Sequence, residues 1–158
     1  IKKALKKFLG IQRRFTKVFS VGKREFYDDY AHHPTEIKAV INSARQVYKD
    51  RKIICVFQPH RYSRVKSLKN EFASSFKYSD TVVLCPVYSA GEKIKYNFNQ
   101  DNFSKLISKK SKTQIINIKN QKELKSYFKK NLLEDEMIIC MGAGSISNWI
   151  REIGDELK

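Results

Sequence analysis

The chain has 158 residues, of which 41% are hydrophobic and 30% charged, and its formal net charge at pH 7 is +16. This length suffices for one domain with a proper core. No apolar stretch reaches the roughly 20 residues that a membrane-spanning helix needs, so we expect a soluble domain. The excess of Lys and Arg would suit a nucleic-acid-binding module. The lysines are spread along the whole chain, however, so a solvated surface is the simpler explanation, and an anionic nucleotide ligand is compatible with it.

The first half of the chain begins with a basic segment and continues with a strand and a helix. Residues 1–9 alternate Lys with apolar residues at helical spacing, which is unlike the apolar core of a signal peptide. A short strand is predicted over residues 24–29. A helix is predicted over residues 34–48, because Pro34 suits the first helical position. The apolar residues that follow at helical spacing are Ile37, Val40, Ile41, Ala44 and Tyr48.

The rest of the chain alternates strand and helix patterns. Apolar runs predict strands at residues 52–57, 81–86, 115–118 and 137–141. Helical spacing is found in four groups, namely Leu68, Phe72 and Phe76; Phe103, Leu106 and Ile107; Leu124, Tyr127, Phe128 and Leu132; and Ile146, Trp149, Ile150 and Ile153. This alternation predicts an α/β fold, a mainly parallel sheet with helices on both faces. Cys55, Cys85 and Cys140 each lie in an apolar run without metal-ligand spacing, so we interpret them as core residues in a reducing compartment.

The segment Asp28-Asp29-Tyr30-Ala31-His32-His33-Pro34-Thr35-Glu36-Ile37 gathers two carboxylates, a phenol and two imidazoles at a helix start. His33, the expected N-cap, is not a favoured capping residue, so the first-turn N–H groups are candidates for binding a phosphate. A simpler interpretation is a turn in which the Asp side chains accept backbone N–H bonds and the histidines are solvated.

Three further segments follow predicted strands: Phe57-Gln58-Pro59-His60-Arg61-Tyr62-Ser63-Arg64, Val87-Tyr88-Ser89-Ala90-Gly91-Glu92 and Met141-Gly142-Ala143-Gly144-Ser145-Ile146. Arginine forks match a carboxylate bidentately, although one of the two arginines could instead pair with a surface acid. The Gly-x-Gly alone is weak evidence for phosphate binding, since tight strand-to-helix turns need glycine regardless. Because ligands collect beyond the carboxyl ends of parallel strands, we expect all four segments to meet at one edge.

These four segments, in this order and preceded by Arg13-Arg14-Phe15, resemble the C-terminal domain of the Mur ligase family, in particular its alanine-adding branch. The resemblance covers nearly the whole chain from residue 10 onward. It implies a Rossmann-like Mur ligase C-terminal domain at residues 11–158, with the end of a central domain or a hinge at residues 1–10. We therefore expect this chain to be a piece of a longer protein.

The resemblance also implies an activity for the whole enzyme, which is ATP-dependent amide-bond formation in cytoplasmic peptidoglycan synthesis, a process linked to cell division and shape. The carboxylate of UDP-N-acetylmuramate is phosphorylated by ATP, the amine of L-alanine attacks the acyl phosphate, and phosphate leaves. Mg²⁺ belongs to the whole enzyme, and we see no metal-ligand set in this chain. A Gly-x-x-x-x-Gly-Lys-Ser/Thr loop is also missing from the sequence, since the family carries it in the central domain and the UDP site in an N-terminal one. This chain alone is therefore expected to be inactive.

The same resemblance assigns roles to single residues. Asp29 is expected to bind the ribose, Tyr30 to contact the nucleotide, and His32 to approach the ATP phosphates as the catalytic candidate, while packing is an equally simple role for Tyr30. The residues expected to bind the amino acid are His60, Arg61, Arg64, Tyr88 and Glu92. Ser145 stands where the family usually has Asp, which removes any specific role for that side chain.

Three alternatives remain from the sequence. A murein tripeptide recycling ligase shares a His-His-Pro-Thr type motif, but the segment at residues 58–64 favours the alanine-adding branch. A basic α/β nucleic-acid-binding module and a standalone nucleotide-binding or regulatory domain are the others. With the Mur ligase interpretation, we expect neither nucleic acid nor a membrane as a partner.

Overall fold

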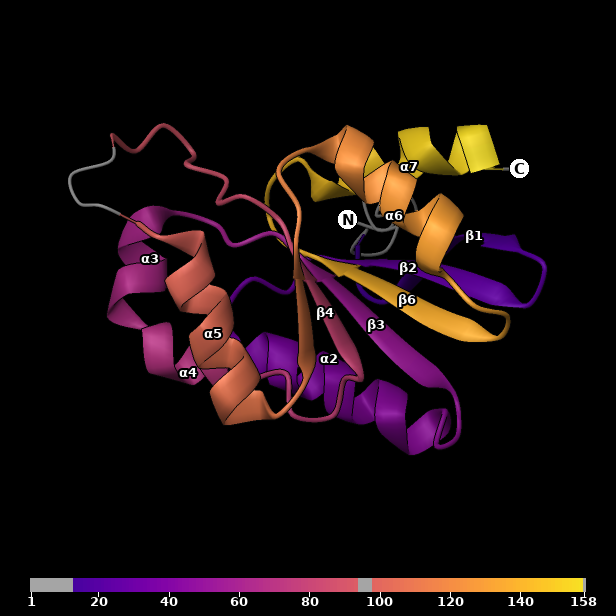
Figure 1. The fold of residues 1–158 in the computed structure, drawn as a ribbon, viewed down its shortest axis with the longest axis horizontal. Helices are drawn as coiled ribbons and strands as arrows, with labels where there is room; N and C mark the ends of the chain where they lie inside the picture. The colour runs from indigo at the N-terminus through magenta and orange to yellow at the C-terminus, as the bar shows by residue number, and fades with distance from the viewer. Residues whose placement is uncertain (1–12, 94–97, 158) are drawn as a thin grey trace, which may run out of the picture.

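The computed structural model describes residues 13–93 and 98–157, so the hinge expected at residues 1–10 lies outside the described part of the chain. The elements are β1 (Thr16–Val21), β2 (Arg24–Asp29), α2 (Pro34–Val47), β3 (Lys52–Phe57), α3 (Tyr62–Ser67), α4 (Lys69–Ala73), β4 (Thr81–Leu84), α5 (Gln100–Ser111), β5 (Gln114–Asn117), α6 (Gln121–Asn131), β6 (Glu136–Met141) and α7 (Ile146–Leu157) (Figure 1). Across these residues, no helix is both long enough and apolar enough to cross a membrane.

The strands form one six-stranded sheet in the order β1-β2-β6-β3-β4-β5. Every neighbouring pair from β2 to β5 is parallel, whereas β1 runs antiparallel to β2. This arrangement confirms the predicted mainly parallel α/β fold. The strand β1 was not predicted, because only Phe19 of its six residues is buried and it lacks the continuous apolar run of β3, β4 and β6.

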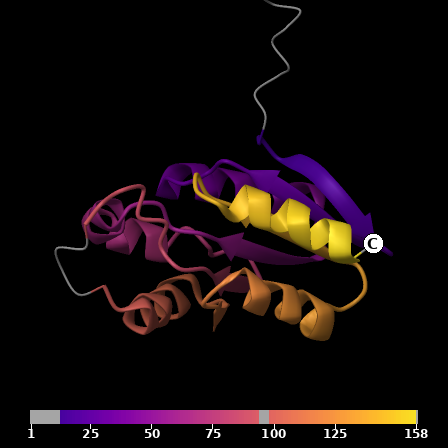
Figure 2. The same cartoon turned by 90° about the horizontal axis from the view of Figure 1, so that it is seen from above.

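Helices cover both faces of the sheet, as predicted, and each face has its own core. The helices α2 to α5 enclose one hydrophobic cluster against the sheet, and α6 and α7 enclose the other. Figure 1 shows α2 and α5 on one side and α6 and α7 on the opposite side, and Figure 2 views the molecule from α6 and α7. Along β3, Ile53, Cys55 and Phe57 belong to the first cluster and Ile54 and Val56 to the second. A central parallel strand buried on both faces has this alternation.

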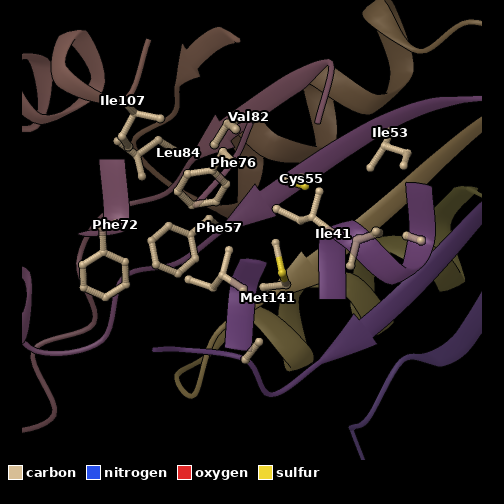
Figure 3. Close-up of a cluster of buried hydrophobic side chains, with 14 of the residues drawn as sticks. Ile41, Ile53, Cys55, Phe57, Phe72, Phe76, Val82, Leu84, Ile107 and Met141 are labelled. Atoms are coloured by element: carbon tan, nitrogen blue, oxygen red, sulfur yellow. The ribbon is translucent and has the colours of Figure 1, made fainter. Parts of the chain in front are cut away.

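The first core is rich in phenylalanine (Figure 3). The ring of Phe57 lies 5.6 Å from that of Phe72 and 5.3 Å from that of Phe76 between centroids, and all three side chains are fully buried. Burying one such side chain contributes about 1.5–3 kcal/mol to stability. The three cysteines are also fully buried and free, and burial raises the pKa of the Cys55 thiol to about 12. The prediction of core cysteines is confirmed.

The helix predicted through Leu68, Phe72 and Phe76 is instead two short helices, α3 and α4, which are separated at Leu68. Phe76 lies beyond the end of α4. The hydroxyls of Ser74 and Ser75 donate to the carbonyls of residues 70 and 71, four positions back. Such side-chain bonds compete with the helical backbone pattern, which explains the early end of α4.

The parallel register aligns the carboxyl ends of the central strands. Asp29 of β2 and Phe57 of β3 are both partners of Met141 in β6, and Phe57 is also the partner of Leu84 in β4. The last residues of four strands therefore lie in one row across the sheet. Three of the four segments singled out in the sequence start at this row, and the segment at residues 87–92 follows shortly after Leu84 and is bridged to His60 through Tyr88, so the predicted convergence on one edge is confirmed.

Candidate functional site

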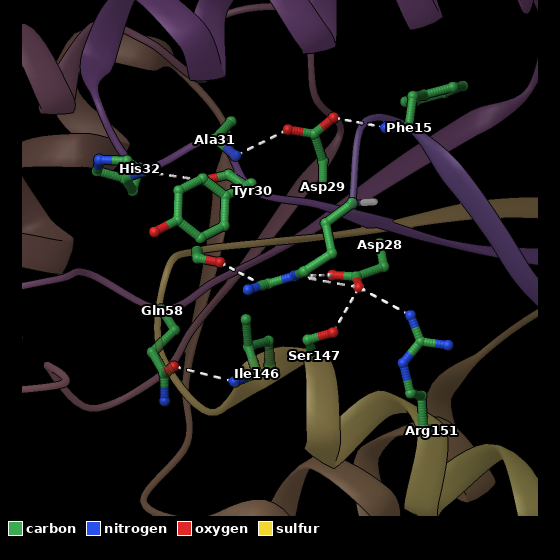
Figure 4. A network of polar contacts seen from close by, with 12 residues as sticks. Phe15, Asp28, Asp29, Tyr30, Ala31, His32, Gln58, Ile146, Ser147 and Arg151 are labelled. Carbon is green, nitrogen blue, oxygen red and sulfur yellow. Dashed lines mark hydrogen bonds and ion pairs between the residues drawn. The ribbon is translucent and has the colours of Figure 1, made fainter. Parts of the chain in front are cut away.

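The edge where these strands end is called the rim below. It consists of residues 28–36, 58–64, 88–92 and 142–147, together with residues 13–15, which enter beside it. Figure 4 shows part of this edge, including Asp28, Asp29, Tyr30, His32 and Gln58.

Asp29 organises the turn between β2 and α2. One of its carboxylate oxygens accepts a hydrogen bond from the Ala31 N–H and the other from the Phe15 N–H, each at 2.7 Å. The residue is only 6% exposed, and burial raises the pKa of its carboxyl although both backbone bonds favour ionisation. The backbone-accepting turn that the sequence left open as the simpler interpretation is therefore present at Asp29, and any ligand hydroxyl would have to share these oxygens.

The start of α2 is capped by its own side chains. Glu36 accepts hydrogen bonds from the backbone N–H groups of His32 and His33, each at 3.0 Å. Burial opposes ionisation of Glu36, but these two bonds hold the pKa of Glu36 below its usual value. The N–H of Thr35 donates to Nδ1 of His33 across 3.4 Å. The expectation that the unusual cap leaves the first-turn N–H groups to a ligand is therefore wrong for Thr35, because the imidazole of His33 acts as the capping acceptor.

His32 and His60 come from different segments and lie near each other, and their Nδ1 atoms have opposite hydrogen-bonding roles. Nδ1 of His32 lies 2.9 Å from the carbonyl oxygen of Tyr30, which can only accept, so Nδ1 carries a proton. Nδ1 of His60 lies 3.4 Å from the guanidinium of Arg64, which can only donate, so this nitrogen is an acceptor. The two rings lie 5.8 Å apart between centroids.

The neutral form of His60 is favoured. Burial lowers the pKa of His60, and the positive charges of Arg64, His32 and Arg61 lower it further. At neutral pH the site therefore presents an uncharged imidazole beside the guanidinium of Arg64.

The segments at residues 58–64 and 87–92 are joined through Tyr88. Its ring stacks on that of His60 at 5.7 Å and 19°, and its backbone exchanges hydrogen bonds of 2.8 Å with Pro59 and Arg61. Nearby, Glu92 accepts from the N–H of Ser63 at 3.2 Å and from its hydroxyl. This bonding lowers the pKa of Glu92. Tyr88 and Glu92, both predicted site residues, thus lie beside the histidine and arginine segment.

The glycine turn after β6 is held by Gln58. The side chain of Gln58 donates to the Ser145 hydroxyl and accepts from the Ile146 N–H, each at 3.0 Å. A Cβ at Gly142 would lie 2.7 Å from the backbone oxygen of Gln58, and one at Gly144 would lie 2.5 Å from the ring of Tyr88. Glycine is therefore required here by close packing between rim segments.

Charges at the rim are unevenly matched. The four carboxylates at the rim accept bonds from backbone, hydroxyl or arginine donors: Asp28, Asp29, Glu36 and Glu92. Arg61 and Arg64 form no ion pair with a described acid. A cleft of about 410 Å³ opens beside Asp29, lined by Arg14, Phe15, Asp29, Tyr30, Ala31, Glu36, Ala39 and Val40. The arrangement suits anionic ligands, whereas no group of three or more His, Cys, Asp or Glu side chains in the described residues is placed to hold a metal ion.

Sequence reasoning gave no individual role to Arg13 or Gln58, although both organise the rim. Arg13 bonds to Asp28 and to the carbonyl of Gly142, 129 positions away, and Gln58 holds the α7 start. Neither contact has a local sequence signal. Only the resemblance of Arg13-Arg14-Phe15 and of the segment at residues 57–64 to one family pointed to these positions.

The fold and the rim thus define a Rossmann-like domain that gathers imidazoles and guanidiniums at the carboxyl ends of its strands. A family model described as "Mur ligase, glutamate ligase domain" matches residues 13–144. The chain belongs to the Mur ligase family, which confirms the resemblance seen in the sequence.

Within that family, the chain is similar to enzymes named UDP-N-acetylmuramate--L-alanine ligase. The protein of that name from Pelagibacter ubique is 51% identical over 97% of this chain, and the one from Agrobacterium fabrum is 38% identical over all of it. The chain spans about a third of the length of either relative, 33% in both cases.

Solved structures agree with this assignment. UDP-N-acetylmuramate-alanine ligase MurC from Thermotoga maritima superposes with a TM-score of 0.69 at 28% identity, covering 98% of this chain and 32% of that one. A murein peptide ligase from Psychrobacter arcticus has a TM-score of 0.75 at 19% identity, covering 98% of this chain and 32% of that one. At that identity, the second likeness concerns the fold alone.

Proposed function

We propose that this chain is the C-terminal domain, at residues 11–158, of an ATP-dependent ligase that joins L-alanine to UDP-N-acetylmuramate in cytoplasmic peptidoglycan precursor synthesis. Residues 1–10 would then be the end of the preceding central domain or a hinge. The alanine ligase branch is favoured over murein tripeptide recycling because the relative from Pelagibacter ubique is 51% identical over almost the whole chain.

One observation carries the proposal. The rings of His32, His60 and Tyr88 form a continuous series with centroid separations of 5.8 and 5.7 Å, and Arg64 lies against His60. These side chains come from three segments that are distant in sequence. A cationic and aromatic group of this kind, at the carboxyl ends of parallel strands, is where an α/β domain binds anionic substrates.

The two sides of the rim would serve different substrates. On the side of β2, Asp29 and Tyr30 border the cleft that would take the ribose and base of ATP, and Nε2 of His32 would act toward the phosphates. This interaction would stabilise negative charge as the muramate carboxylate is phosphorylated.

On the side of β3 and β4, the forks of Arg64 and Arg61 would bind the carboxylate of L-alanine. His60, which is neutral, would complete the amino-acid site without adding charge of its own, with Tyr88 stacked on it and the carboxylate of Glu92 nearby. These residues would orient the amine of L-alanine toward the acyl phosphate. Such orientation can lower the activation free energy by several kcal/mol.

We assign no ligand of a divalent cation to the described residues. The carboxylates of the rim already accept bonds from protein donors, and the described residues contain no group of three ligand-type side chains suited to a metal ion. The roles given to the rim residues are therefore independent of Mg²⁺.

The test is a phosphate-release assay with the longer protein that contains this chain. Release is expected only when ATP, UDP-N-acetylmuramate and L-alanine are all present, and the 158-residue chain alone is expected to release none. Turnover of L-alanyl-γ-D-glutamyl-diaminopimelate in place of L-alanine would assign the protein to tripeptide recycling instead. Activity of the isolated chain would contradict the proposed division of labour.

A further inference from the structure

Asp28, which precedes the expected ribose-binding residue, is the centre of a buried charge cluster. It is fully buried, and its Oδ2 accepts from the Ser147 hydroxyl at 2.5 Å and from the guanidinium groups of Arg13 and Arg151, each at 3.3 Å. Figure 4 shows Ser147 and Arg151 directed toward Asp28. The carboxylate therefore ties the end of β2 to α7 and to the segment where the chain enters the domain.

Arg13 extends this cluster to the Gly142 turn and to Tyr30. Its Nη2 donates to the carbonyl of Gly142, and its guanidinium carbon lies 5.0 Å from the centroid of the Tyr30 ring. The backbone N–H of Tyr30 also donates to the carbonyl of Arg13 at 2.7 Å. A single arginine thus contacts Asp28, the glycine turn and an aromatic residue of the cleft.

The backbone around Arg13 supports a specific function for this contact. Arg13 has φ of 71° and Phe15 has φ of 46°, both in the left-handed region that non-glycine residues rarely adopt. Phe15 is held there by the bond from its N–H to Asp29. Backbone strain of this kind persists only where surrounding contacts impose it, and it concentrates at functional sites.

We propose that Arg13 and Asp28 form a positioning clamp that sets Tyr30 and the Gly142 turn for the nucleotide and that acts on the amino-acid side only indirectly, through the packing of that turn against Gln58 and Tyr88. The clamp rests on the proposed function for its link to ATP. Its described contacts reach Tyr30 and Gly142, whereas His60 and Arg64 are positioned by Tyr88 and by each other. Neither Arg13 nor Asp28 is a catalytic residue, since both would act through the residues that they hold.

Arg151 offers a matched control. It bonds to the same oxygen of Asp28 at the same distance as Arg13, but from α7 on the outer side, with a side chain that is 51% exposed. Its described bond goes to Asp28 and does not reach Tyr30 or the Gly142 turn. Arg151→Met therefore removes one charge partner from Asp28 and leaves the connection from Arg13 to Tyr30 in place.

The kinetic test uses the longer ligase with Asp28→Asn, Arg13→Lys and Arg151→Met. Asp28→Asn and Arg13→Lys are each expected to raise the KM for ATP about tenfold, because small displacements of positioning groups are costly, and to leave the KM for alanine within about twofold. Arg151→Met should leave both constants within about twofold. Equal changes for the two substrates in Asp28→Asn and Arg13→Lys, or an ATP effect of the same size in Arg151→Met, would overturn the proposal.

A second measurement does not depend on activity. In NMR spectra of the 158-residue chain, Arg13→Lys should shift the Tyr30 ring and Gly142 amide signals while those of His60 stay in place. The conservative Arg13→Lys keeps the charge, so it serves even if Asp28→Asn fails to fold. Unchanged Tyr30 and Gly142 signals would overturn the clamp itself. If the Tyr30 and Gly142 signals shifted but the longer protein had no ligase activity, the clamp would stand and the proposed function would be wrong.

Discussion

The two ends of the parallel sheet both carry arginines, but the arginines are bonded differently. At the amino ends of the strands, Arg51 pairs with Glu25 at 2.5 Å and with Asp135 at 3.0 Å. Arg45 pairs with Asp80 at 2.6 Å and donates to the carbonyl of Arg51 at 2.8 Å. These two guanidiniums are committed to holding strand ends and turns together, and each has several acceptors.

At the rim, by contrast, Arg61 and Arg64 have no acid partner among the described residues, and the only side-chain bond described for Arg64 goes to a neutral imidazole. The sequence alone does not distinguish these arginines. In the structure, Arg45 and Arg51 stabilise the fold, whereas Arg61 and Arg64 are candidates for binding a ligand. Whether an arginine forms an ion pair depends on tertiary structure. This property therefore distinguishes a candidate binding arginine from a structural one better than residue type does.

The largest effect on stability is expected from the packed glycine turn of the rim. Gly142→Ala should lower the free energy of unfolding by about 3 kcal/mol, because φ of 149° is almost restricted to glycine and the new Cβ would lie 2.7 Å from a backbone oxygen. The control is Gly22→Ala at the opposite end, where φ is 60° but no atom lies within 4 Å. It should cost only about 1 kcal/mol. Urea denaturation of both variants measures the difference, and equal losses would show that the rim is not tightly packed.

Substituting the unpaired arginine tests ligand binding. Arg64→Ala in the longer protein should raise the KM for alanine about 30-fold, because a charge-assisted bidentate contact is lost, with a smaller effect on the KM for ATP. Arg45→Ala, from the paired set, should leave both constants unchanged. Initial-rate kinetics with each substrate varied in turn give the comparison. Equal effects of Arg64→Ala on both substrates would contradict the assignment of Arg64 to the amino acid.

The converse holds for stability. Arg51→Ala should lower the free energy of unfolding by about 2 kcal/mol, because it leaves several acceptors at the strand ends without a donor. Arg61→Ala should change it by less than about 0.5 kcal/mol. Chemical denaturation of the 158-residue chain checks both values. If the two variants lost the same stability, the contrast between the two ends of the sheet would be wrong.

The smallest expected effect concerns pH. The pKa of folded His60 lies below its ordinary value, so the unfolded chain binds a proton more readily at this position. Its contribution to stability is present above the unfolded pKa of about 6.5 and is lost as the pH falls through the folded value. His60→Gln should therefore flatten the decline in stability below about pH 6.5, and Arg64→Ala should flatten it partly. Denaturation curves at a series of pH values measure this effect. If the free energy of unfolding of His60→Gln fell with decreasing pH as steeply as that of the original protein, protonation of His60 would not be the cause of the decline.

Much of the fold follows from local sequence patterns. Strands at residues 24–29 and 52–57 were predicted with the bounds that the structure has. The second is a nearly continuous apolar run, and the first ends in a polar turn that marks its boundary. The convergence of the four segments followed from the rule for parallel sheets. The edge strand at residues 16–21, by contrast, has a single buried side chain, and the sheet order depends on long-range pairing that no local pattern contains.

The candidate site was predictable in location but not in detail. Residue types indicated His32, His60 and Arg64, yet only the fold reveals which nitrogen of each histidine carries a proton. The sequence suggested that Asp side chains accept backbone N–H bonds in this turn, but not that Asp29 also holds the N–H of Phe15 or that Arg13 reaches Gly142. Such contacts join residues that are far apart in the chain, so they depend on packing and not on local propensity.

The antiparallel direction of β1 has a mechanical consequence. Thr16, the first residue of this strand, pairs with Asp28 near the carboxyl end of β2, so the polypeptide enters the domain beside the rim and not at the opposite end of the sheet. Any partner domain attached ahead of residue 13 would be tethered at the mouth of the cleft. Attachment at that point would raise the effective concentration of the partner domain at the rim. A small rotation about the attachment point would then be enough to bring the two domains together or to separate them.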